Sequence, residues 1–120
     1  MTSAEVKEEA ERLIRYWQRQ LRIEDWDIEV IVPDHDPGGA AKVSSLNAMG
    51  KAKITVRNPS LHPPESYGSP DLELSVVHEL LHLRFPHINP PQQTIEDQSY
   101  EIGIERTAQA LVRLNRGERR

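Results

Sequence analysis

The chain has no cysteine, few aromatic residues and no long apolar run. Phe, Trp and Tyr together make up 5% of its 120 residues. Without cysteine the fold cannot rest on disulfides, and any metal site must use histidine and carboxylate ligands. No stretch has the roughly 20 consecutive apolar residues that a helix needs to cross a bilayer. We therefore expect no membrane-spanning segment.

Positive charge is scarce as well. The formal net charge is -4 at pH 7, whereas proteins that bind nucleic acid usually carry a basic stripe, so we expect no nucleic-acid partner. The N-terminal segment is acidic where a secretion signal would be basic and then apolar, which predicts mature structure in the cytoplasm. The basic residues after Val112 are predicted to form a short solvated terminus; they are Arg113, Arg116, Arg119 and Arg120.

Hydrophobic periodicity predicts a single α+β domain over residues 1–120, with an N-terminal helix packed on a short three-stranded sheet. The expected elements are a helix over residues 3–22, strands over residues 26–32, 41–46 and 51–57, and helices over residues 70–84 and 95–115. A hairpin turn at residues 47–50 joins the last two strands. The expected helix caps are Thr2 or Ser3, then Ser69, then Thr94. Lys51, Lys53 and Arg57 are predicted to lie on the solvent face of the third strand.

The segment VVHELLHL at residues 76–83 is strongly apolar, yet it carries His78, Glu79 and His82. On a helix the two histidines lie one turn apart and about 40° apart around the axis, so both imidazoles can point at one spot. Apolar residues cover almost all the rest of the circumference, which predicts a helix buried nearly all round. In the pattern H-E-x-x-H, two histidines hold Zn²⁺ and the glutamate acts as general base. The segment therefore predicts a zinc site with Glu79 as the catalytic base.

A catalytic zinc site takes three protein ligands, so a third His or carboxylate must face inward from elsewhere in the chain. In the last predicted helix, helical angles place Glu101 and Glu105 beside the apolar stripe. Glu96 lies well round the helix from that stripe. Asp97 sits in the first turn, where the helix dipole by itself favours an acid. Glu101 and Glu105 are therefore the two candidates for the third ligand.

With these residues the chain resembles the gluzincins, which are zincin metallopeptidases whose third ligand is a glutamate, and it looks most like the small single-domain minigluzincins. The resemblance rests on HELLH at residues 78–82 and EIGIERTA at residues 101–108. It implies a zincin-like fold, Zn²⁺ as cofactor and hydrolysis of peptide bonds by a zinc-activated water. By position it also implies that Glu101 is the third ligand and that Glu105 is the acid hydrogen-bonded to His78.

The residue that stabilises the oxyanion is left open by this resemblance. Many such enzymes use a Tyr or a His for that role. The candidates in this chain are Tyr67, Tyr100, His62 and His87. The resemblance also implies a peptide or protein substrate that binds an edge strand by β-augmentation. We expect that strand to be residues 51–57 or residues 41–46.

Two other interpretations stay open. One is a zinc-stabilised binding or regulatory module that is latent or has no peptidase activity, although a purely structural site would have no use for Glu79. The other is a metal-free helical interaction domain with two buried histidines. His35 lies between two aspartates in the loop at residues 34–39 and is predicted to be part of a solvated turn. Nothing in the sequence points to a particular oligomeric state.

Overall fold

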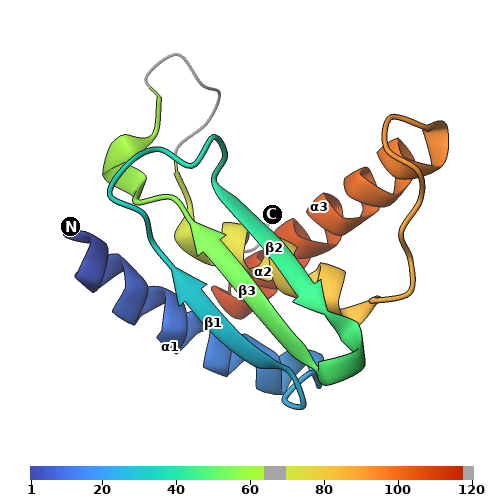
Figure 1. Cartoon of the computed structure of the whole chain (residues 1–120), viewed down its shortest axis with the longest axis horizontal. Helices are drawn as coiled ribbons and strands as arrows, with labels where there is room; N and C mark the ends of the chain where they lie inside the picture. The colour runs from blue at the N-terminus through green and yellow to red at the C-terminus, as the bar shows by residue number, and fades with distance from the viewer. Residues whose placement is uncertain (64–69, 118–120) are drawn as a thin grey trace.

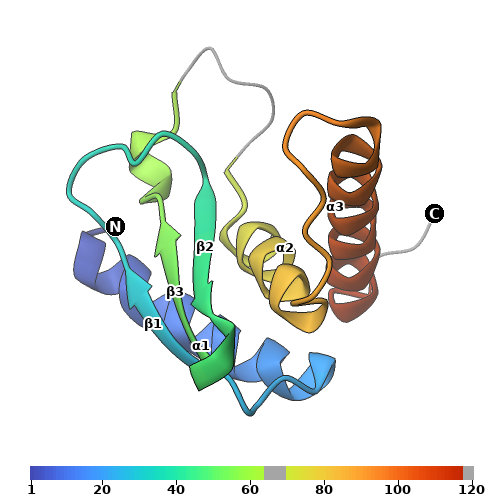
Figure 2. The same ribbon diagram turned by 45° about the vertical axis from the view of Figure 1, so that its right-hand side comes forward.

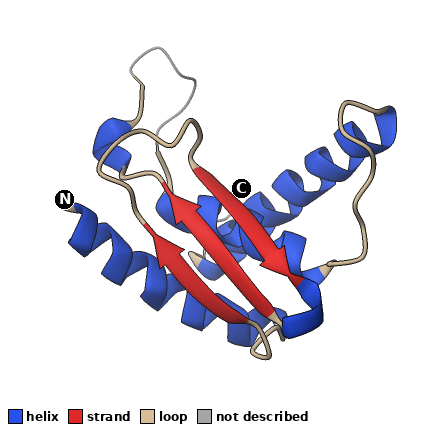
Figure 3. Cartoon of the chain, in the orientation of Figure 1, coloured by secondary structure: helices blue, strands red, loops and turns tan. Residues whose placement is uncertain are grey.

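The computed structural model describes residues 1–63 and 70–117. Its helices and strands are α1 (Ser3–Leu21), β1 (Asp27–Ile31), β2 (Ala41–Leu46), β3 (Lys51–Val56), α2 (Leu72–Arg84) and α3 (Ile95–Asn115). Two short 3-10 turns follow β2 and β3, namely η1 (Asn47–Met49) and η2 (Pro59–Leu61). The fold is therefore α+β, and each predicted helix and strand is present (Figure 3). In the part of the chain that is described, no helix is long and apolar enough to cross a membrane.

Side-chain caps determine where the helices begin. Thr2 caps α1 and Thr94 caps α3, as the sequence predicts. In α2 the cap is Asp71, whose carboxylate accepts the Leu74 N–H at 3.0 Å. This helix therefore starts two residues later than predicted. The predicted cap, Ser69, lies outside the described residues.

The three strands form a mixed sheet in the order β1-β3-β2. β3 pairs in parallel with β1 and antiparallel with β2. The predicted turn at residues 47–50 joins β2 to β3, and Gly50 adopts a positive φ of 64° there. β3 is therefore central, because β1 occupies its other side. The prediction that residues 51–57 form a substrate-binding edge is wrong, whereas β2, at residues 41–46, does lie at an edge of the sheet.

Two helices cover one face of the sheet, and no helix of the described residues covers the other face (Figure 1 and Figure 2). Figure 1 shows the sheet in front of α1 and α2, and Figure 2 shows α2 between the sheet and α3. This central position explains why α2 is buried nearly all round, as predicted. The α2 side chains in the core are Val76, Val77, Leu80, Leu81 and Leu83. The face of α2 that carries the histidines is thus held between the sheet edge and α3.

The core position of Leu80 makes it a sensitive test of this packing. Leu80 is 0% exposed, and we expect Leu80→Ala to lower the free energy of unfolding by about 2–5 kcal/mol, since it leaves a cavity in the core. Leu114→Ala is the matched control, because Leu114 is 74% exposed and surface substitutions change stability by only about 0.5 kcal/mol. Urea unfolding followed by circular dichroism measures both. Equal effects of the two substitutions would contradict the central position of α2.

A polar network joins the start of α2 to the ends of the other two helices. Glu73 accepts hydrogen bonds from Trp17 Nε1 at 2.8 Å and from Asn115 Nδ2 at 3.2 Å. Arg116 pairs with Glu73 at 3.2 Å and with Asp71 at 2.9 Å. Arg116 is exposed, as predicted for a solvated terminus, but the sequence does not predict that two carboxylates at the start of α2 lie within reach of its guanidinium. These contacts hold α3 against α2 at the end remote from the loop that connects them.

Candidate metal centre

His78 and His82 project from one face of α2 into the space beside α3. Their rings lie one helical turn apart, with centroids 5.2 Å from each other. Each of the two side chains is 20% exposed, while the neighbouring Leu80 and Leu81 are buried in the core. The two imidazoles are therefore accessible to solvent on a helix that is otherwise largely buried.

α3 brings Glu101 to the same place. Its Oε2 lies 3.4 Å from His78 Nε2, and its Oε1 lies 3.2 Å from His82 Nε2. The ligand atoms of these three residues all lie within 4.8 Å of one another. Across residues 1–63 and 70–117, they form the only group of three or more His, Cys, Asp or Glu side chains with such spacing. An acid of the last helix does meet the two histidines, as the sequence predicts.

The spacing and the chemistry of these atoms fit a divalent metal ion. Ligand atoms about 2.0–2.2 Å from a tetrahedral ion lie roughly 3.3–3.6 Å from one another, which is close to the two nitrogen-to-oxygen distances. Imidazole and carboxylate both bind zinc, and both also bind other first-row metals. The group of His78, His82 and Glu101, termed the HHE cluster below, can therefore bind a metal ion.

The far nitrogen of each histidine contacts a residue of α3. His78 Nδ1 lies 2.9 Å from Glu105 Oε1, and the other oxygen of Glu105 accepts a hydrogen bond from Gln109 Nε2 at 2.7 Å. His82 Nδ1 lies 3.1 Å from the Tyr100 hydroxyl. Contacts of this kind orient imidazoles that bind metals, and here they leave both Nε2 atoms facing the cluster. Glu105 thus lies behind His78, in the place that the family resemblance implies.

Glu79 lies beside the HHE cluster on the side that faces β2. Burial raises the pKa of its carboxyl above the ordinary value, and the charge of Glu101 raises it further. His78 and a backbone hydrogen bond from Val43 oppose these effects without cancelling them. Burial also lowers the pKa of His82, which favours the neutral imidazole that binds metals. The site thus combines a carboxyl that protonates more readily than usual with an imidazole that protonates less readily.

A cleft runs along β2 past the cluster. Its main part is a cavity of about 610 Å³. The walls of this cavity are β2, the face of α2 with Glu79 and His82, the part of α3 with Tyr100 and Glu101, and the loop at residues 86–92. The HHE cluster therefore opens onto a groove that one edge of the sheet borders along its length.

The backbone of β2 turns alternate groups toward this cleft. The Arg57 N–H donates to the Ala40 carbonyl at 2.9 Å, and the register of β2 with β3 makes these two residues a hydrogen-bonded pair. Because such pairs alternate along antiparallel strands, Ala41 and Val43 direct their N–H and C=O groups away from β3. The Val43 N–H reaches Glu79 there. The edge of β2 thus offers backbone groups at the level of the cluster.

The remaining candidates lie in different places. His62 lines a second cavity at one end of the cleft. His87 is exposed in the loop after α2, and His35 is exposed in the loop after β1, as predicted for a solvated turn. Tyr67 lies outside the described residues. Tyr100 borders the main cavity, but its hydroxyl contacts the far nitrogen of His82, a contact that the sequence does not predict.

The contacts of two further residues, Gln109 and Arg57, are not predicted from the sequence. Gln109 follows Glu105 by one helical turn, and this spacing is a usable signal for their hydrogen bond. Arg57 is predicted to lie on a solvent face, and that prediction is wrong, because the residue comes after the end of β3 and its side chain is 11% exposed. No local sequence pattern indicates that the Arg57 side chain is buried.

Comparisons with protein-family models, curated proteins and solved structures give no match for this chain. The structure establishes an α+β domain and a His-His-Glu cluster that can bind a metal ion. Function must therefore be argued from the geometry of the cluster and of the cleft beside it.

Proposed function

We propose that the protein is a zinc-dependent endopeptidase with a zincin-like site of the gluzincin type. The observation that carries the proposal is the convergence of His78 Nε2, His82 Nε2 and the Glu101 carboxylate at the spacing of metal ligands. Glu79 lies beside them in a cleft of about 610 Å³ that β2 borders. The resemblance of HELLH and EIGIERTA to minigluzincin sequences supports the same assignment.

His78, His82 and Glu101 would hold the zinc ion. Two neutral imidazoles and one carboxylate are a ligand set of catalytic zinc, in which a fourth position stays open. When bound, the ion would supply Lewis acidity that activates water and polarises a peptide carbonyl. Glu105 and Tyr100 would keep the imidazoles in orientation through their contacts with the Nδ1 atoms.

Glu79 would transfer the proton during hydrolysis. Its carboxylate takes a proton from the attacking water, whose oxygen forms a bond to the carbonyl carbon of the peptide. It then gives that proton to the amine nitrogen as the C–N bond breaks. The place of Glu79 in the wall of the cleft, next to His78, His82 and Glu101, supports this role.

An extended substrate would lie along β2. Its backbone would pair by β-augmentation with the N–H and C=O of Ala41 and with the C=O of Val43, since the Val43 N–H is engaged by Glu79. This pairing places the peptide over Glu79 without any movement of the sheet, since β2 is already an edge strand. Of the two strands expected to bind substrate, β2 is the one that this proposal retains.

Cleavage of a peptide mixture tests the proposed function. The purified chain is incubated with Zn²⁺ and a digest-derived peptide mixture, and new termini are identified by mass spectrometry. We expect internal bonds to be cut, cleavage to stop when a chelator is added, and cleavage to return with fresh zinc. The matched control is His78→Ala. The proposal is wrong if the zinc-loaded wild type cuts neither the peptides nor unfolded proteins.

Tyr100→Phe separates the two roles open to Tyr100. We expect it to weaken zinc binding by about 10- to 100-fold, because it removes the hydroxyl that contacts His82 Nδ1. Competition with a chromogenic chelator measures the affinity. The control is Tyr16→Phe, which removes a hydroxyl hydrogen-bonded to Asn115 in the helix network. Unchanged zinc affinity with a lower kcat at saturating zinc would instead assign Tyr100 to the oxyanion.

A further inference from the structure

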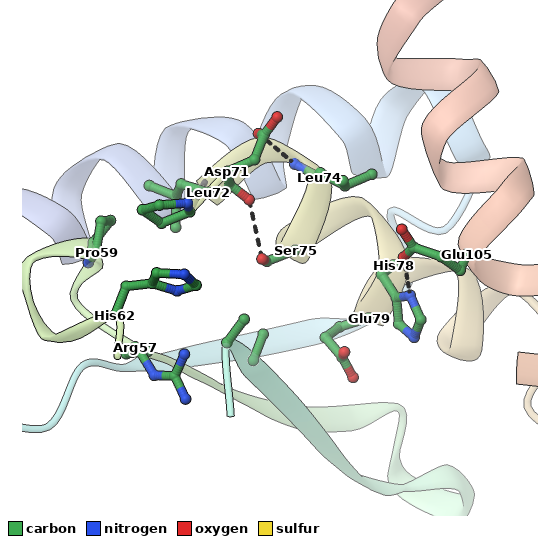
Figure 4. Close-up of a pocket in the computed structure, with 13 residues that line it drawn as sticks. Arg57, Pro59, His62, Asp71, Leu72, Leu74, Ser75, His78, Glu79 and Glu105 are labelled. Carbon is green, nitrogen blue, oxygen red and sulfur yellow. Dashed lines mark hydrogen bonds and ion pairs between the residues drawn. The ribbon is translucent and has the colours of Figure 1, made fainter. Parts of the chain in front are cut away.

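A second cavity opens from the cleft at the Ala41 end of β2. Its volume is about 320 Å³, at the lower end of the roughly 300–1,000 Å³ of ligand pockets, so it suits a single side chain or a terminal residue. Figure 4 shows His78 and Glu79 on one side of it and Arg57 and His62 on the other. This cavity, termed the Arg57 pocket, therefore begins beside the proposed catalytic base.

Arg57 gives the pocket a nearly buried positive charge. Its side chain is 11% exposed, and its Nε–H donates to Asp36 Oδ1 at 2.9 Å. Asp36 belongs to the loop after β1 and does not line the pocket. The ion pair fixes the orientation of the guanidinium, whose fork carries further N–H donors suited to two-point contact with a carboxylate. His62 lines the pocket on the same side.

The acidic side chains that line the pocket are each engaged by other groups. Asp71 is paired with Arg116 at 2.9 Å. Glu105 contacts His78 Nδ1 at 2.9 Å, and Glu79 has the backbone hydrogen bond from Val43. These three acids therefore do not pair with Arg57, whose described ion pair with Asp36 uses Nε and leaves the terminal guanidinium N–H groups to contact a ligand carboxylate.

We propose that the Arg57 pocket binds a carboxylate of the peptide substrate on the C-terminal side of the cleaved bond. β2 runs from the pocket toward the loop at residues 86–92, and antiparallel pairing is the commoner arrangement of strands. A substrate paired in that way runs in the opposite direction, so its C-terminal part enters the pocket. The inference rests on the proposed peptidase function and specifies its substrate class. The carboxylate is supplied by an Asp or Glu side chain or by the peptide terminus.

Matched peptides distinguish these two sources. One series keeps a sequence cut in the peptide mixture and places Glu, Gln, Lys or Leu directly after the cleaved bond. A second series ends one residue after that bond with either a free or an amidated terminus. We expect kcat/KM to favour Glu over Gln, or the free over the amidated terminus, by about 10- to 100-fold, the range for a hydrogen bond to a charged group.

Substitutions of Arg57 connect the preference to the pocket. We expect Arg57→Leu to abolish it and Arg57→Lys to keep part of it, since lysine retains the charge without the planar fork. Lys53→Leu is the matched control, because Lys53 is exposed on the open face of the sheet. Calorimetric binding of the same peptides to the zinc-loaded Glu79→Gln variant measures recognition without hydrolysis.

The outcomes separate this inference from the proposed function. Wild-type hydrolysis without preference in either series overturns the inference and leaves the peptidase assignment standing. The same preference in wild type and Arg57→Leu also overturns it. Absence of all hydrolysis by the zinc-loaded wild type overturns the peptidase assignment itself. If melting curves show that Arg57→Leu is unfolded, the wild-type ranking and the Arg57→Lys variant decide the question.

Discussion

Glu79→Gln is expected to lower kcat/KM for peptide hydrolysis by about 10²- to 10⁴-fold, the usual contribution of a general base, while zinc binding is retained. Glutamine has nearly the same size as glutamate, and its amide oxygen can still accept the hydrogen bond from Val43. It cannot take a proton from water at neutral pH. Glu79 is not one of the three residues of the HHE cluster, so the substitution leaves the proposed zinc ligands in place.

The measurement compares initial rates on one peptide with elemental analysis of the same samples. Glu96→Gln is the matched control, because Glu96 is exposed on α3 and well away from the cluster face. Equal rates for wild type and Glu79→Gln would remove Glu79 from the catalytic role. If the wild type binds zinc and binds peptides without cutting them, the chain is a binding module. Glu79→Gln should then still bind the same partner.

Local sequence patterns predicted the helices, the two histidines and two candidate acids, Glu101 and Glu105, whereas the choice of Glu101 came from the resemblance to gluzincins. His78 and His82 share a face because of their spacing within one helix, and Glu101 shares the face of α3 that carries Ile104 and Ala108 in the core. Two helices that each bury an apolar stripe must turn those stripes toward each other. The polar residues beside the stripes are then brought together as well. The meeting of the two imidazoles with an acid therefore follows from patterns that each helix carries by itself.

Features that depend on contacts between distant segments were not predictable in this way. The alternation of Lys51 and Lys53 with apolar residues describes a strand with one solvated face, but it fits an edge strand and a central strand equally well. β3 is central because β1 pairs with it from the far side. The ion pairs of Arg116 with Asp71 and of Arg57 with Asp36 join segments far apart in the chain. The residues next to Arg116 and Arg57 in the sequence do not indicate which acid each of them pairs with.

Zinc is expected to raise the melting temperature of the wild type by at least about 10 °C when free zinc is near 1,000 times the dissociation constant. At that ratio a ligand that binds only the folded state adds about 4 kcal/mol of stability, and a domain of this size gains a few degrees per kcal/mol. Glu101→Ala should remove this stabilisation, because it deletes one of three ligand groups. Thermal unfolding with and without zinc, together with elemental analysis, measures the effect.

Comparison with Glu105→Ala decides which acid is the ligand. Glu105 contacts the far nitrogen of His78, so its loss should weaken zinc binding by about 10- to 100-fold, as for other residues behind a metal ligand. Loss of Glu101 should weaken it by more than that range. The melting temperature of metal-free Glu101→Ala is the reference for this comparison, because Glu101 also contacts both imidazoles in the absence of an ion. If Glu105→Ala loses more zinc affinity than Glu101→Ala, then Glu105 is the metal ligand and Glu101 is not.

If the wild-type protein binds no zinc and its melting temperature does not change when zinc is added, there is no metal site.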